Sequence, residues 1–124
     1  MNSKLLLAAI AVIVPISALQ AMTVAVFLQK ADALQARGMM AMFSSDVGLL
    51  KAEVQGAGQA LRTEVEGAQR AGRQPAFCPP PRGPARMSST ELLNYFRSIP
   101  APQRQRLEVR DAMRGMMIRR FPCR

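Results

Sequence analysis

Two cysteines are the only side chains in this 124-residue chain whose type and spacing predict a covalent bond. Cys78 and Cys123 bracket one segment, and an even cysteine count is typical of a disulfide formed in an oxidising compartment. Such a bond would stabilise the closed loop by about 4 kcal/mol in the chain-entropy description. Two unpaired cysteines in a cytoplasmic protein are the alternative interpretation.

Other residues that could do chemistry are scarce. The chain has no histidine, which excludes a His-dependent catalytic triad, a Cys/His zinc site and the usual neutral-pH proton shuttle. The acidic candidates in the C-terminal part are Glu91, Glu108 and Asp111, and Glu91 is already explained as a helix cap. The sequence therefore predicts no catalytic residue, no metal site and no cofactor, and the chain is not expected to be an enzyme.

Positive charge is concentrated in residues 73–124, which contain eleven arginines and three acidic residues and so carry +8 of the formal +9. Arg106, Arg110 and Arg114 recur at fourfold spacing and predict a basic stripe on one helix. The planar guanidinium group suits carboxylates and phosphates, so the expected partner is an acidic protein, with anionic lipid headgroups or a negatively charged envelope polymer as alternatives. Nucleic acid is not expected, because a disulfide-bonded segment lies outside the cytoplasm and few aromatic side chains are present for stacking. A solvated arginine-rich surface is the alternative.

The elements that must position these residues begin with a long apolar run. Residues 5–28 contain no charge and would form a helix about 36 Å long, enough to cross a hydrocarbon core of about 30 Å. The run predicts a signal-anchor over residues 1–30 in a bacterial inner membrane, and the cysteine pair favours an orientation with the C-terminal part in the periplasm. A cleaved signal peptide, which would release the chain into the periplasm, is the alternative.

Residues 31–72 have a helical pattern and predict a stalk, with a weak coiled-coil repeat. The apolar positions of that repeat are Val47, Leu50, Val54, Ala57, Leu61, Val65 and Ala68. A second stripe consists of Gly48, Ala52, Gly56 and Ala60, small residues that would let another backbone approach closely. The stalk is therefore predicted to form a homo-oligomer or to lie against a partner helix, with a frayed amphipathic linker as the alternative.

An apolar cluster of Met39, Met40, Met42 and Phe43 precedes this stripe and is too short to span a bilayer. Apolar clusters at helical spacing usually belong to a core, so the sequence favours packing against another helix. A flexible surface that touches lipid or a partner is the alternative, because methionine adapts to irregular contacts.

The C-terminal part divides into a proline-rich linker, residues 73–87, and a helical hairpin, residues 88–124. Ser88 and Glu91 have the spacing of a capping box, and Pro102 suits the first turn of a second helix. The predicted core face of that second helix contains Val109, Ala112, Met113, Met116 and Met117. The predicted fold class is all-α: an N-terminal transmembrane helix, a helical stalk and a small two-helix unit closed by Cys78 and Cys123.

Four sequence elements in this region are FCPPP at 77–81, SSTELLNYFRSIP at 88–100, a helix containing Ala112 and Met113, and the closing FPC at 121–123. With these elements, residues 78–124 resemble the second half of the Rap/Tai-type immunity-protein family. The resemblance implies a small helical periplasmic protein of Gram-negative bacteria, associated with type VI secretion, that binds a toxin. Two functions are expected. The first is a membrane-anchored, non-enzymatic binding protein of this immunity type that contacts an acidic protein through its C-terminal unit; the alternative is a structural small subunit of an envelope complex that uses the anchor and the small-residue stripe.

Overall fold

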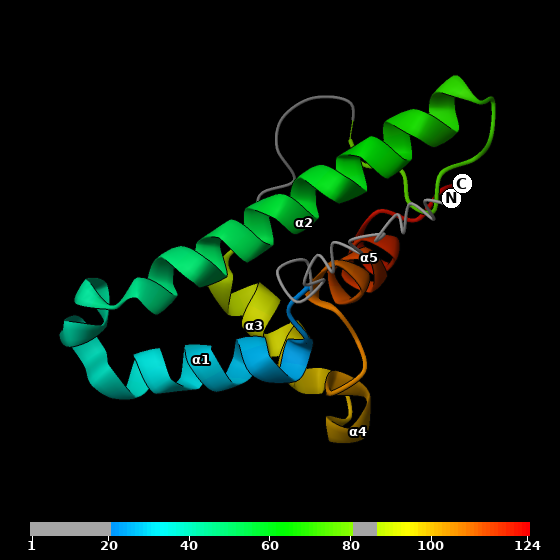
Figure 1. Cartoon of the computed structure of the whole chain (residues 1–124). Coiled ribbons are helices and arrows are strands. Elements are labelled where there is room, and N and C mark those ends of the chain that lie inside the picture. The colour runs from blue at the N-terminus through cyan, green and yellow to red at the C-terminus, as the bar shows by residue number, and fades with distance from the viewer. Residues whose placement is uncertain (1–20, 81–86) are drawn as a thin grey trace, which may run out of the picture.

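The computed structural model describes residues 21–80 and 87–124, and these residues form helices around one hydrophobic core (Figure 1). The elements are α1 (Val24–Arg37), the 3-10 helix η2 (Gly38–Phe43), α2 (Ser45–Arg70), α3 (Ser89–Ser98), α4 (Ala101–Arg104) and α5 (Val109–Arg120). Within the described residues the one extended pairing is an isolated bridge between Thr23 and Glu108. The all-α prediction is confirmed for this part of the chain.

Helices α1 and α2 diverge from η2 like the arms of a V, and α3 and α5 lie between them (Figure 1). Gly38 ends α1 with φ of +58°, a left-handed value that glycine adopts without strain. Ser44 caps α2 by accepting a hydrogen bond from the Asp46 backbone N–H. Lys30 reaches across the V to Asp46, with 3.1 Å between Nζ and Oδ1, and so ties the two arms together.

Helix α2 continues through its glycines for 26 residues, because its apolar stripe is buried. Leu50, Ala57, Leu61 and Val65 are the buried members of the predicted repeat. They face the interior of this chain, where α2 packs most extensively against α5 and next against α1. The predicted separate stalk is therefore wrong, since residues 31–72 contribute one side of the core.

Helix α3 begins where its cap predicts. Ser88 and Glu91 form the expected capping box at the start of α3, with both hydrogen bonds at 3.1 Å. The second predicted helix is broken, because α4 ends at Arg104 and α5 starts only at Val109. After a turn at Gln105 and Arg106, the Val24 N–H donates to the Leu107 carbonyl and the Val109 N–H to the Met22 carbonyl. This turn and the pairing with the segment before α1 thus replace about one turn of helix.

The core joins both halves of the sequence. Val24, Phe96 and Val109 have no solvent exposure, and the Phe27 ring packs edge-to-face on Phe96 with 5.4 Å between centroids. Other buried residues of the core include Leu28, Ala31, Phe77, Leu92, Ile99, Ala112, Met113 and Met116. The predicted two-helix unit is accordingly incomplete by itself, because α1 and α2 supply the surfaces that cover α3 and α5.

The predicted disulfide is confirmed: Cys78 and Cys123 are bonded, with their Cα atoms 4.9 Å apart. The Cys78 N–H also donates to the Phe121 carbonyl at 2.8 Å, and the neighbouring Phe77 is buried. The segment that follows α2 is thereby held against the end of α5.

The predicted membrane span lies mostly outside the described residues, which begin at Ala21. In residues 21–80 and 87–124 no helix combines the length and the apolar character needed to cross a bilayer. The last residues of the apolar run belong to α1, where Val24, Phe27 and Leu28 are buried in the core. The predicted boundary at residue 30 therefore falls inside α1.

Candidate functional site

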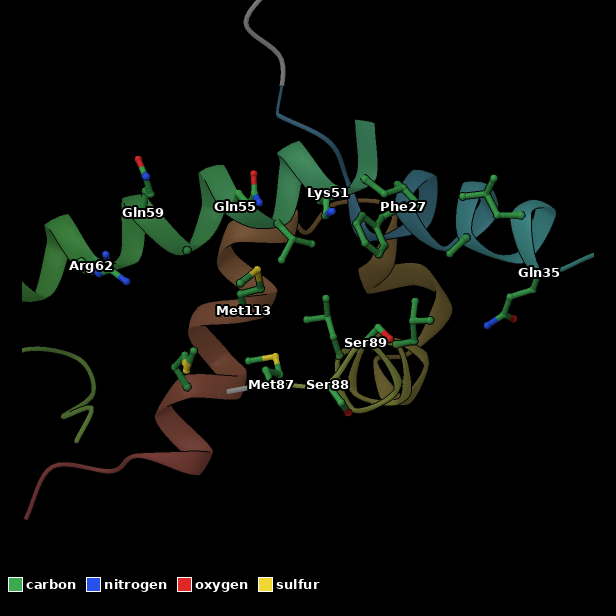
Figure 2. Close-up of a pocket in the computed structure, with 18 residues that line it drawn as sticks. Phe27, Gln35, Lys51, Gln55, Gln59, Arg62, Met87, Ser88, Ser89 and Met113 are labelled. Carbon is green, nitrogen blue, oxygen red and sulfur yellow. The ribbon is translucent and has the colours of Figure 1, made fainter. Parts of the chain in front are cut away.

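A groove of about 950 Å³ opens between α1, α2, α3 and α5 (Figure 2). Its lining residues are Phe27, Ala31, Leu34, Gln35, Leu50, Lys51, Val54, Gln55, Gly58, Gln59, Arg62, Met87, Ser88, Ser89, Leu92, Leu93, Met113 and Met117. This volume lies within the range of ligand sites in proteins, which are mainly apolar with a few polar groups.

The wall of the groove is apolar and partly accessible to solvent. Apolar lining residues on its wall are only half-buried: Leu34, Val54, Met87, Leu93 and Met117. Small residues on α1 and α2 leave space in the groove. Ala31 on α1 has only a methyl side chain, and a Cβ added at Gly58 on α2 would meet nothing within 4 Å. Met87 and Met113 both line the groove (Figure 2). Methionine side chains adapt to partners of irregular shape, so this wall suits an apolar ligand.

The α2 edge of the groove is polar and cationic. Lys51, Gln55, Gln59 and Arg62 follow one another along α2 at helical spacing, and all four are exposed. No acidic residue lines the groove, and in the part of the chain that the structure describes no ion pair involves Lys51 or Arg62. An anionic group on a bound ligand would therefore be attracted to this edge.

The three arginines of the predicted basic stripe do not lie on one helix, because α5 starts at Val109 and contains Arg110 and Arg114 but not Arg106. Their use as a partner-binding surface stays a prediction. Arg114 donates from Nε to Glu64 Oε2 at 3.0 Å and from Nη1 to Asp111 Oδ1 at 2.6 Å, and Nη2 donates to Glu64 Oε1. Arg110 Nε lies 3.7 Å from Asp111 Oδ1, and Arg106 is exposed in the turn after α4. Arg114 is thus engaged within the chain, and Arg106 lies outside α5, the helix that carries the other two arginines.

Charge pairing shifts the pKa values of Glu64 and Arg114. The hydrogen bonds from Arg114 hold the pKa of Glu64 below its ordinary value of 4.5. The same bonds, first with Glu64 and then with Asp111, raise the pKa of Arg114. This bidentate pair fastens α2 to α5, so Arg114, the last cation of the stripe, has a structural role.

The acidic candidates also have structural partners. The backbone N–H of Ser88 is the main cause of a lowered Glu91 pKa, and the charge of Arg120 adds to it. Glu108 and Asp111 lie within 3.8 Å of Arg110. Residues 21–80 and 87–124 contain no group of three side chains able to hold a metal ion.

The small-residue stripe lies on the surface of α2. Gly48, Ala52 and Gly56 are exposed and Ala60 is half-buried, and a Cβ at either glycine would meet nothing within 4 Å. Part of the stripe borders a hollow of about 210 Å³ next to Ala21. The stripe is therefore available to a partner helix, and its use as an interface stays a prediction.

Sequence reasoning missed the groove because its lining comes from four helices that are far apart in the chain. One signal was present: Lys51, Gln55, Gln59 and Arg62 form a polar edge directly beside the apolar repeat of α2. Comparison with models of known families, with curated proteins and with solved structures gives no match for this chain.

Proposed function

We propose that this chain is a non-enzymatic, membrane-tethered binding protein whose groove receives an amphipathic helix from an acidic protein partner. The observation that carries the proposal is the open apolar groove with a cationic edge and no acidic lining residue. Lodging one apolar helix face in a groove is a recurrent way for helical proteins to recognise partners. Acidic residues beside that face would meet Lys51 and Arg62.

The dimensions of the groove suit a helix. Lys51 and Arg62 are eleven positions apart on α2, which corresponds to about 16 Å, or about three helical turns. A partner helix of three turns presents three or four apolar side chains on one face. The half-buried residues Val54, Leu93 and Met117 line the groove that would receive them.

The cellular setting is proposed from the sequence and the disulfide. The apolar run, whose last residues form the start of α1, would attach the chain to the bacterial inner membrane, and the Cys78–Cys123 bond favours an oxidising compartment such as the periplasm. The resemblance of residues 78–124 to the Rap/Tai-type immunity proteins supports a secreted toxin as the partner. The groove replaces the arginine stripe as the proposed contact surface, because Arg114 is paired with Glu64 and Asp111.

A second function, structural small subunit of an envelope complex, is favoured by a different observation. The stripe of Gly48, Ala52 and Gly56 is exposed along α2 and has no neighbour within 4 Å of its glycine Cβ positions. Such a surface allows close helix contact without charge.

Purification of the tagged full chain from solubilised membranes tests the first function and separates it from the second. We compare wild type with K51E/R62E, which reverses the charge of the groove edge, and with R70E/R73E. The control pair makes the same charge change at exposed positions outside the groove.

We expect one acidic protein to be recovered with wild type and with R70E/R73E, and to be lost with K51E/R62E and in high salt. Equal recovery with K51E/R62E would contradict the groove proposal. A partner that withstands high salt and K51E/R62E but is lost with G56L would support the structural-subunit function instead.

A further inference from the structure

The most exposed apolar side chains among those described lie together at the point of the V. In η2, Met39 is 84% exposed, Met40 69%, Met42 78% and Phe43 86%. The sequence favoured packing against another helix for this cluster, and the structure contradicts that expectation. None of the four residues belongs to the core or packs against it, so the fold itself does not explain their apolar character.

The backbone of this tip, residues 39–43, and of the residues that flank it forms hydrogen bonds within the chain. The Gly38 N–H donates to the Gln35 carbonyl, and the Ser44 N–H donates to the Ala41 carbonyl at 2.9 Å. Entry into the apolar part of a bilayer requires that backbone polar groups be satisfied within the protein. The 3-10 conformation therefore lets the tip present methionine and phenylalanine with few free polar groups.

Charge around the tip favours lipid as the occupant. Arg37 is the only charged residue from position 37 to position 44, and no carboxylate in that stretch would repel anionic headgroups. Four side chains on a convex point are also far fewer than the 20–30 residues that each partner typically contributes to a stable protein interface. A bilayer needs no complementary surface, only apolar side chains of sufficient reach.

The course of α1 gives a second reason. Its outward face carries Val26, Gln29, Ala33 and Ala36, which are exposed and uncharged. Helix α1 is about 21 Å long, its first residues are the last of the apolar run and its other end meets the tip, so both ends of α1 adjoin apolar sequence.

We propose that the tip, residues 39–43, inserts into the headgroup region of the bilayer, with Arg37 at the lipid phosphates and α1 along the membrane surface. The inference rests on the membrane attachment in the proposed function and does not involve the groove. It assigns the exposed cluster a lipid surface as ligand.

Tryptophan fluorescence tests the insertion directly, because the chain contains no tryptophan. We compare F43W with I118W, a variant at an exposed apolar position of α5. Each full-length variant is reconstituted into vesicles of phosphatidylethanolamine and phosphatidylglycerol, with or without lipids brominated near the headgroup. Flotation of the vesicles measures membrane attachment separately from tip insertion.

We expect both variants to float, and the emission of F43W alone to shift to shorter wavelength and to be quenched several-fold more strongly by brominated lipid. Emission of F43W that is water-like, or blue-shifted without bromine quenching, would overturn the inference; the second result would indicate a protein contact at the tip. If neither variant floats and F43W is not quenched, the attachment and the insertion both fail. As a check, the M42D/F43D variant should float but lose the tip's protection from aqueous hydroxyl-radical footprinting at Met39, and unchanged protection would also count against insertion.

Discussion

Arg114 joins two helices through partners that lie far apart in the sequence. Its guanidinium group holds Glu64, fifty positions earlier, and Asp111, three positions earlier. Arg97 and Arg120 likewise pair with Asp32 and Glu91. Three of the eleven arginines that make the C-terminal part basic thus hold helices to one another.

Replacement of Arg114 by methionine should destabilise the fold by about 1 kcal/mol at neutral pH. Glu64 is 44% exposed, so solvent screening limits the value of this pair. The folded-state pKa of Glu64 is lowered, so its contribution is present above the ordinary value of 4.5 and is lost as pH falls through the lowered pKa. Urea denaturation of wild type and R114M should accordingly differ at pH 7 and converge in acid. A difference that persists after Glu64 is protonated would contradict this role.

Tyr95 and Gly115 form a second residue-scale test. A Cβ at Gly115 would lie 2.7 Å from the Tyr95 Oη and 3.9 Å from its Cζ, so the hydroxyl alone is in the way. Alanine is about 1 kcal/mol better than glycine inside a helix. We expect G115A to stabilise the Y95F variant by about that amount and to give no gain in wild type. Equal stabilisation in both backgrounds, measured as a double-mutant cycle, would rule out the steric coupling.

At the scale of elements, α2 shows what patterning does and does not specify. Its apolar spacing correctly indicates that Leu50, Ala57 and Leu61 face a hydrophobic surface. The spacing cannot say whether that surface belongs to a second chain or to α5, because both present the same apolar environment. Glycines inside a helix are destabilising by themselves. Packing against α5 stabilises α2 despite its glycines.

The exposed glycines of α2 give a prediction for the isolated protein. G56A should raise the free energy of unfolding by about 0.5–1 kcal/mol, because the added methyl group meets nothing and alanine favours the helix. G72A is the matched control: Gly72 has φ of +69°, a conformation that alanine adopts with strain, so that variant should be destabilised. Thermal unfolding in detergent measures both changes. A loss of stability in G56A would show that the stripe is already packed against another helix.

The disulfide links two elements and predicts a cooperative effect. C78S, C123S and the double variant should each lose about 2–5 kcal/mol, because every one of them removes the same bond. Since α5 packs on α2, limited proteolysis of these variants should also open α2. Mild and additive losses in the two single variants would indicate that the bond contributes little.

At the scale of the whole molecule, local signals predicted much and long-range ones little. The capping box at Ser88, the core face of α5 and the cysteine pair depend on short spacing or residue count, and the structure confirms all three. The break before Val109 was not predicted, since it depends on pairing with Met22, more than eighty positions away. The groove and the exposed tip likewise arise only when α1 and α2 diverge.

The groove as a partner-binding surface is the central claim, and site-specific photo-crosslinking in living cells tests it most directly. A photoreactive amino acid replaces Leu93, which is half-buried in the groove, or Ile118, which is exposed outside it. We predict a protein adduct at position 93 alone, whose crosslinked peptide has apolar residues at helical spacing beside Asp or Glu, and which K51E/R62E abolishes. No adduct at position 93, or an adduct with lipid there, would contradict the account.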